Sequence, residues 1–88
     1  MEFEWNPLKA LENQEKHGVG FEDAVTAFTD PHGLRIPDPD HSFEEERFLL
    51  LGMTWDMRIL VVSHCYRGGS DSIRIISART ATSRERGQ

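Results

Sequence analysis

The spacing of hydrophobic positions divides the chain into a helical first third and a strand-rich remainder. Asn6-Pro7 joins a favoured helix N-cap to a proline at the first helical position, and Gly18 can adopt the left-handed conformation that ends helices. These signals predict a helix from about Pro7 to His17. A second helix is predicted because hydrophobic residues recur at intervals of three and four, at Phe21, Ala24, Val25 and Phe28. Asp30-Pro31 is expected to end it.

After the second helix the pattern changes to that of β-strands. Leu34-Arg35-Ile36 is a short predicted strand, and the residues from Pro37 to Ser42 have turn composition throughout. Three further hydrophobic segments, joined by short loops, predict strands at Arg47 to Leu51, Arg58 to Cys65 and Ser72 to Ala78. Successive strands with short connections form an antiparallel meander, and helices that precede it must cover one face.

The two ends of the chain complete the predicted fold. Phe3-Glu4-Trp5 alternates like a short strand, and the tail from Thr80 predicts a short helix that would fray unless a partner holds it. The sequence therefore predicts one α+β domain over residues 1–88, with two N-terminal helices packed on an antiparallel β-sheet and a short C-terminal helix.

The composition also indicates the cellular compartment of the protein. Cys65 is the one cysteine, which excludes an internal disulfide and fits a reducing cytosol; inside a hydrophobic segment it is expected to be a core residue. The acidic start is unlike a signal peptide, and no apolar segment approaches the roughly 20 residues that span a membrane. We expect a cytoplasmic protein with no membrane partner.

Charge is distributed unevenly along this acidic chain, whose net charge is −5. Residues 1–46 contain 3 basic and 12 acidic side chains, whereas residues 47–88 contain 7 arginines and 3 acidic side chains. Such a division usually gives the folded protein one face that attracts anions.

Five arginines are the leading candidates for function, because they recur across the three predicted strands: Arg47, Arg58, Arg67, Arg74 and Arg79. In a strand, Ile73 and Ile75 share one face and Arg74 points to the other. A meander would bring the five into one patch, where guanidinium groups can bind phosphate in a bidentate fashion. The alternative is that each forms an ordinary cross-strand charge pair.

Three other side chains are candidates for proton transfer or phosphate binding. Lys16 and His17 end the first helix, where both complement its negative terminus, but His17 could also exchange a proton while Lys16 neutralises a phosphate. Glu46 belongs to an acidic run before Arg47 and could orient that arginine or act as a base.

Several chemistries receive little or no support. The chain has no Walker loop, dinucleotide fingerprint, nucleophile elbow or zinc spacing, and we expect no cofactor. A divalent-metal site at His32, Asp38, Asp40 and His41 is a weaker alternative to a plain hydrophilic loop. His64 is expected to be a hydrogen-bonded strand histidine, and Trp55 could stack on a base.

The order of these motifs resembles the BrnT family, the toxins of type II toxin–antitoxin systems. The first half of the resemblance rests on Phe3-Glu4-Trp5-Asn6-Pro7, Lys9-Ala10, Asn13, Lys16-His17-Gly18-Val19, Phe21-Glu22, Ala24, Phe28 and Asp30-Pro31. The second half rests on Glu45-Glu46-Arg47, Gly52, Leu60-Val61-Val62, Arg74-Ile75-Ile76-Ser77-Ala78-Arg79, Ala81 and Glu85.

The resemblance implies a RelE-like fold and a ribonuclease that arrests translation. It also implies a BrnA-type antitoxin with a ribbon-helix-helix DNA-binding domain as partner. By motif, the positions it marks as functional are Lys16, His17, Glu46, Arg47, Arg74 and Arg79.

The sequence leads to the hypothesis of a metal-independent endoribonuclease. His17 or Glu46 would transfer protons, while Arg74 and Arg79 would hold the phosphate. The remaining cations assigned to RNA phosphates are Lys16, Arg47, Arg58 and Arg67. The net acidity suggests targeting through the ribosome. A non-enzymatic module that docks a protein partner on the arginine face is the alternative.

Overall fold

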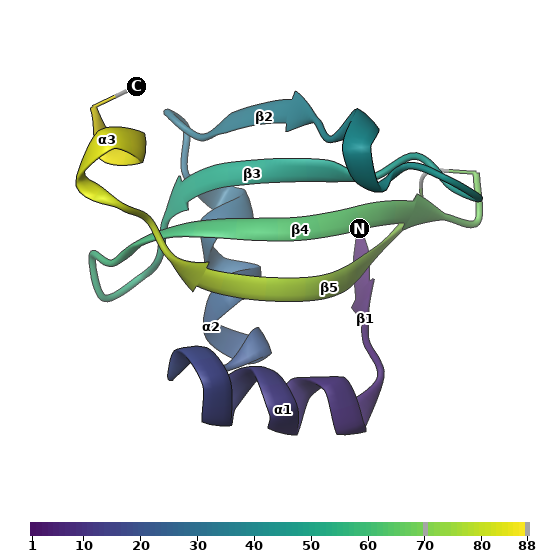
Figure 1. The fold of residues 1–88 in the computed structure, drawn as a ribbon, viewed down its shortest axis with the longest axis horizontal. Helices are drawn as coiled ribbons and strands as arrows, with labels where there is room; N and C mark the ends of the chain where they lie inside the picture. Colours follow the sequence, from purple (N-terminus) through teal and green to yellow (C-terminus); the bar gives the residue numbers. More distant parts are fainter. Residues whose placement is uncertain (70, 88) are drawn as a thin grey trace.

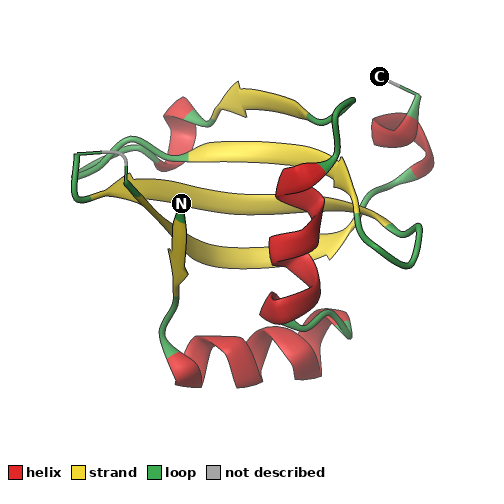
Figure 2. Ribbon diagram, turned by 180° about the vertical axis from the view of Figure 1, so that it is seen from behind, coloured by secondary structure: helices red, strands yellow, loops and turns green. Residues whose placement is uncertain are grey.

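The computed structural model describes residues 1–69 and 71–87, which form a five-stranded sheet with helices on one side (Figure 1, Figure 2). The elements in chain order are β1 (Glu2–Glu4), α1 (Pro7–His17), α2 (Phe21–Thr26), the 3-10 turn η1 (Ala27–Thr29), β2 (Leu34–Pro37), the 3-10 turn η2 (Pro39–His41), β3 (Phe48–Met53), β4 (Ile59–Arg67), β5 (Ser72–Thr80) and α3 (Ser83–Arg86). No helix in the described part of the chain is both long enough and apolar enough to cross a bilayer.

The sheet has the order β1-β5-β4-β3-β2. Strands β2 to β5 pair antiparallel, as the meander predicted. Strand β1 instead pairs parallel with β5, from Glu2 opposite Ser72 to Glu4 opposite Arg74. The predicted α+β fold is therefore confirmed, but its sheet is mixed, not purely antiparallel. A segment of three residues contains no local signal for the strand that it will join.

Helix α1 has the bounds that its terminal signals predicted. The Asn6 side chain accepts hydrogen bonds from the backbone N–H groups of Leu8 and Lys9, at 2.8 and 3.3 Å. Gly18 adopts φ 69° and returns its N–H to the Gln14 carbonyl. The second helix is shorter than its hydrophobic period suggested, because after Thr26 it tightens into η1.

The hydrophobic core lies between α2 and the sheet, and Figure 2 shows α2 crossing the strands. Its fully buried side chains include Phe21, Leu60 and Ile75. Gly52 of β3 allows the closest approach, because a Cβ there would lie 2.7 Å from the Ala27 carbonyl oxygen. A side chain at this position would force η1 away from the sheet.

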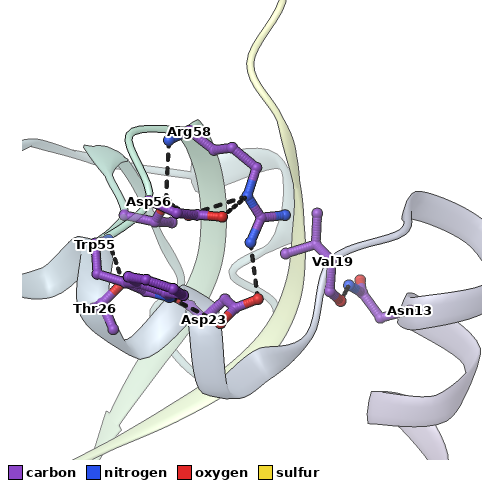
Figure 3. Close-up of polar contacts among 8 residues, drawn as sticks. Asn13, Val19, Asp23, Thr26, Trp55, Asp56 and Arg58 are labelled. Carbon is purple, nitrogen blue, oxygen red and sulfur yellow. Dashed lines mark hydrogen bonds and ion pairs between the residues drawn. The ribbon is translucent and has the colours of Figure 1, made fainter.

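One buried side chain attaches α1 to the edge of β5. Asn13 Nδ2 donates to the carbonyl oxygens of Ala78 and Val19, at 2.9 and 3.0 Å, and Asn13 Oδ1 accepts from Ala78 N at 3.0 Å (Figure 3 shows the contact with Val19). Strand β1 covers this edge of β5 only at Ser72–Arg74. The Asn13 amide thus satisfies the C=O and N–H groups of Ala78, which a longer β1 would otherwise have paired.

A register shift in the β4–β5 pair determines which side chains reach the opposite face. Ser63 pairs with Ser77, but the next residue, His64, pairs with Ile75. Ile76 is therefore an extra residue in β5. As a result, Ile76 and Ser77 both line the face of the sheet turned away from α2.

Replacing Asn13 by alanine should lower the free energy of unfolding by about 3 kcal/mol, because the buried N–H and C=O of Ala78 would lose their partners. Urea denaturation measures this loss. Glu12→Ala is the matched control, since Glu12 is an exposed residue of the same helix. A loss no larger than that of the control would contradict the role assigned to Asn13.

Candidate nucleic-acid interface

One face of the sheet is covered by neither α1 nor α2, and it is turned toward the viewer in Figure 1. Here we call it the open face. Ile73 and Ile75 are buried toward the helices, so Arg74 between them points to the open face, as predicted. Arg79 follows the buried Ala78 and reaches the same face, where it lines a depression.

A depression of about 320 Å³ on the open face brings two of the predicted arginines together, and we call it the arginine depression. These are Arg47, the residue before β3, and Arg79, which belongs to β5. The complete lining is Asp38, His41, Arg47, Leu49, Val61, Ser63, Ile76, Ser77 and Arg79. Two guanidinium groups and two hydroxyl groups around a shallow hollow suit a phosphate and its ester oxygens.

Arg79 is held in place by the short C-terminal helix. Its Nη1 and Nη2 donate to Glu85 Oε1 and Oε2, each at 2.8 Å. The same carboxylate accepts from Thr82 N at 2.8 Å, while Thr82 Oγ1 accepts from Glu85 N, so α3 begins with a capping box. The predicted helix is thus tied down by the chain itself. Hydrogen bonds from Arg79 are the main reason that the pKa of Glu85 falls to about 2.

One N–H group of the Arg47 side chain has no hydrogen-bond acceptor among the described residues. This group, at Nε, is buried. The nearest carboxylate oxygen, Glu45 Oε1, lies 3.9 Å away, too far for a hydrogen bond. Glu45 also lies 3.7 Å from Arg67, so it is shared between two arginines. A buried, unsatisfied N–H is uncommon in proteins.

His41 and Asp38 form an oriented pair beside these arginines. His41 Nδ1 lies 3.0 Å from Asp38 Oδ2; the aspartate side chain is 15% exposed and the histidine side chain 65%. The Asp38 N–H donates to the Arg47 carbonyl at 2.9 Å, and Ser42 Oγ accepts from Arg47 N at 2.9 Å. These bonds place the histidine and Arg47 at one rim. From the sequence we considered His41 only as a metal ligand. The signal for the pair was Asp38, a carboxylate three residues before the histidine.

The remaining predicted arginines lie outside the depression. Arg74 pairs with Glu4 at 3.8 Å across the β1–β5 ladder, which is the cross-strand charge pair considered as its alternative role. Arg67 lies at the end of β4, and its nearest carboxylate is Glu45.

Arg58 does not join the open-face arginines. It precedes β4 and turns toward α2, where it pairs with Asp23 at 2.8 Å and Asp56 at 3.0 Å (Figure 3). The hydrogen bond to Asp56 is the main reason that its pKa is raised. Trp55, a possible base-stacking residue, donates its Nε1–H to Asp23 at 3.2 Å and is exposed. The prediction that all five arginines share one patch was therefore wrong for Arg58.

The arginine depression is lined neither by the side chains predicted for proton transfer, His17 and Glu46, nor by the predicted phosphate ligand Lys16. Lys16 and His17 end α1, beside the β5 edge of the sheet. Glu46 lines a second depression, with Arg35, Phe48 and Tyr66 among its neighbours. The catalytic roles of these residues stay predictions.

Two buried residues have pKa values shifted by burial. Cys65 is fully buried, as predicted, and burial raises the pKa of its thiol, which disfavours the nucleophilic thiolate. Burial lowers the pKa of His64, whose Nδ1 lies 3.0 Å from the Val62 carbonyl while Nε2 is buried without a partner in the described chain. His64 therefore forms the predicted hydrogen bond at one ring nitrogen only. No three His, Cys, Asp or Glu side chains among the described residues form a metal-binding group.

A sheet backed by helices, with arginines and hydroxyl groups around a hollow on its free face, defines a small α+β protein equipped to bind phosphate-bearing ligands. A family model described as "Ribonuclease toxin, BrnT, of type II toxin-antitoxin system" matches residues 5–85. The chain therefore belongs to the BrnT family of ribonuclease toxins, which cleave RNA and have cognate antitoxins.

A solved structure supports the fold. The crystal structure of the Brucella abortus ribonuclease toxin BrnT is similar with a TM-score of 0.71 and 24% sequence identity, over 93% of this chain and 97% of that chain. This likeness shows that the two chains share a fold. No match was found among curated proteins.

The Arg79–Glu85 pair should make stability depend on pH. Glu85 has an ordinary pKa of 4.5 and a folded-state pKa of about 2, so its contribution is complete above pH 4.5 and is lost as pH falls toward 2. The difference in free energy of unfolding between the wild type and Glu85→Gln should shrink over that interval. Denaturation at several pH values measures it, with the exposed Glu44→Gln as control. A difference that does not change with pH would contradict the pairing.

Proposed function

We propose that this protein is a metal-independent endoribonuclease that arrests translation by cleaving RNA at the arginine depression. The ribose 2′-oxygen attacks the adjacent phosphorus as a base removes its proton. The bond to the 5′-oxygen breaks, and that oxygen receives a proton from an acid. The products are a 2′,3′-cyclic phosphate and a free 5′-hydroxyl. The observation that carries the proposal is the meeting of Arg47 and Arg79 in one depression on the open face.

The two arginines have different parts in holding the scissile phosphate. Arg79 uses two of its five N–H bonds on Glu85, which fixes the guanidinium plane and leaves three N–H bonds for phosphate oxygens. Arg47 lines the same depression and brings a second guanidinium group to it. Such fixed donors stabilise charge that increases in the transition state, and they need no reorganisation during the reaction.

His41 is the side chain whose position favours proton transfer. Asp38 holds Nδ1, which leaves the other ring nitrogen to exchange a proton with the reacting oxygens. An imidazole can both accept and donate a proton, so one residue can act as base and later as acid. His17 and Glu46, favoured from the sequence, lie outside the arginine depression, and we retain them as candidates for direct comparison.

The physiological partners follow from the family. A cognate antitoxin is implied by membership of a type II system, and we propose a BrnA-type protein with a ribbon-helix-helix domain. The net charge of −5 disfavours binding of free RNA, since phosphate contacts dominate that affinity. Delivery of the substrate by the ribosome would compensate for weak intrinsic binding.

Replacing Arg79 by lysine should reduce cleavage by about 100-fold, because lysine keeps the charge but loses the fork of donors. Arg47→Ala should give a similar loss. The assay follows a defined RNA with chelator present and identifies fragment ends, with translating ribosomes added in a parallel series. Arg86→Ala is the control, since Arg86 is exposed and outside the depression. Unchanged rates for both test variants would refute the phosphate-binding assignment.

The proton-transfer residue is identified by comparing His41→Ala, His17→Ala and Glu46→Gln in the same assay. We expect His41→Ala to lose about 100-fold or more in rate while the other two retain cleavage. Asp38→Asn should produce a smaller loss, because it alters the orientation of the imidazole. If His17→Ala abolishes cleavage and His41→Ala does not, the proton transfer belongs to the end of α1.

A further inference from the structure

A second depression, of about 430 Å³, lies beside the start of β3 and the end of β4. We call it the aromatic depression; it is lined by Arg35, Glu45, Glu46, Phe48, Tyr66 and Gly69. Glu46 and Phe48 flank Arg47 in sequence, yet Arg47 lines the arginine depression while its two neighbours line this one. Successive side chains of a strand point to opposite faces, so the two hollows lie on opposite faces of the sheet, with the aromatic depression on the face of Leu50 and His64.

A rigid planar platform forms one wall of the aromatic depression. The Arg35 guanidinium carbon lies 4.9 Å from the Phe48 ring centroid and 5.4 Å from the Tyr66 centroid. Arg35 Nη1 donates to the Tyr66 hydroxyl at 2.8 Å, which fixes the orientation of the guanidinium. Phe48 and Tyr66 pack edge to face at 5.4 Å, and both also pack on the buried His64 ring. Guanidinium planes and aromatic rings are the surfaces on which proteins stack unpaired RNA bases.

The polar groups of this depression indicate which base would be bound. Glu46 is exposed and forms no ion pair with any described residue. An ionised carboxylate only accepts hydrogen bonds, so it suits an edge with two adjacent donors. Among the four RNA bases, guanine alone presents two neighbouring donors, N1–H and the 2-amino group. The other three bases place an acceptor beside each donor on that edge, which a carboxylate would repel.

We propose that the aromatic depression is a nucleobase subsite selective for guanine, which binds a nucleotide of the RNA substrate away from the scissile phosphate. This inference rests on the proposed function, because it assumes that the ligand is the RNA cleaved at the arginine depression. Guanine stacks on the Arg35 platform, and Glu46 accepts from N1–H and the 2-amino group. Glu46 thus determines substrate specificity and takes no part in proton transfer.

Binding without cleavage tests the subsite directly. We would titrate the full chain with guanosine, inosine and adenosine monophosphates and follow the backbone NMR signals of residues 35, 46 and 66. Inosine lacks the 2-amino group, so it should bind about tenfold more weakly than guanosine, and adenosine at least as weakly. Glu46→Gln should remove the difference between guanosine and inosine, whereas Glu44→Gln should keep it. Equal binding of all three nucleotides by the wild-type chain would overturn the proposal.

Cleavage then tests whether the subsite selects the substrate. RNAs that contain a single guanosine should be cut at a fixed distance from it, and replacing it by inosine should lower kcat/KM about tenfold. In Glu46→Gln the two substrates should become equal. A general-base role for Glu46 would instead slow both substrates to the same degree, and that result would overturn the specificity role.

The same experiments separate the two proposals. Selective guanosine binding with no cleavage of any RNA would refute the proposed function but not the guanine subsite. Cleavage that is unaffected by guanosine position would leave the ribonuclease in place and refute the subsite. Tyr66→Ala should weaken all three nucleotides together, since it removes support for the stacking surface and not the hydrogen bonds.

Discussion

The fold depends on how the exposed edge of β5 is satisfied. This strand connects β1 to the rest of the sheet and carries Arg74 and Arg79, yet β1 covers only three of its residues. Asn13 completes the edge by bonding both backbone groups of Ala78, and its third bond holds the Val19 carbonyl. One side chain therefore fixes α1 against the sheet and determines where the chain turns toward α2. Buried backbone groups without such a partner would cost as much as a lost hydrogen bond each.

With the edge closed, the sheet acquires two unlike faces. One is packed under α2, with Gly52 allowing close approach of η1. The other is covered by neither α1 nor α2, and the register shift after Ser63 places two consecutive residues of β5 on it. The carboxylate of Glu85 joins this face to the end of the chain, because it caps α3 and also orients Arg79. The short helix has too few residues to be stable alone, so its position depends on that ion pair.

The division of charge along the sequence is largely neutralised in the folded protein. Acidic residues of the first half reach the arginines of the second half, as Glu4 reaches Arg74 and Asp23 reaches Arg58. What distinguishes the candidate site is therefore not a large positive field but the placement of a few donors. The clearest of these is the guanidinium of Arg79, which Glu85 holds at the arginine depression. Weak attraction for free RNA and specific contacts at one phosphate are compatible in such a surface.

The sequence by itself determined the features that local rules govern. Asn6 and Gly18 fixed the bounds of α1, alternation placed Arg74 opposite Ile73 and Ile75, and the order of motifs indicated the BrnT family. Only the tertiary structure decided the parallel pairing of β1, the direction of Arg58 and the meeting of His41, Arg47 and Arg79. Caps and periodicity act over a few neighbouring residues, so they can be read from the chain. Pairings between distant residues depend on which buried groups each strand leaves unsatisfied, and that is settled only when the sheet and its helices pack together.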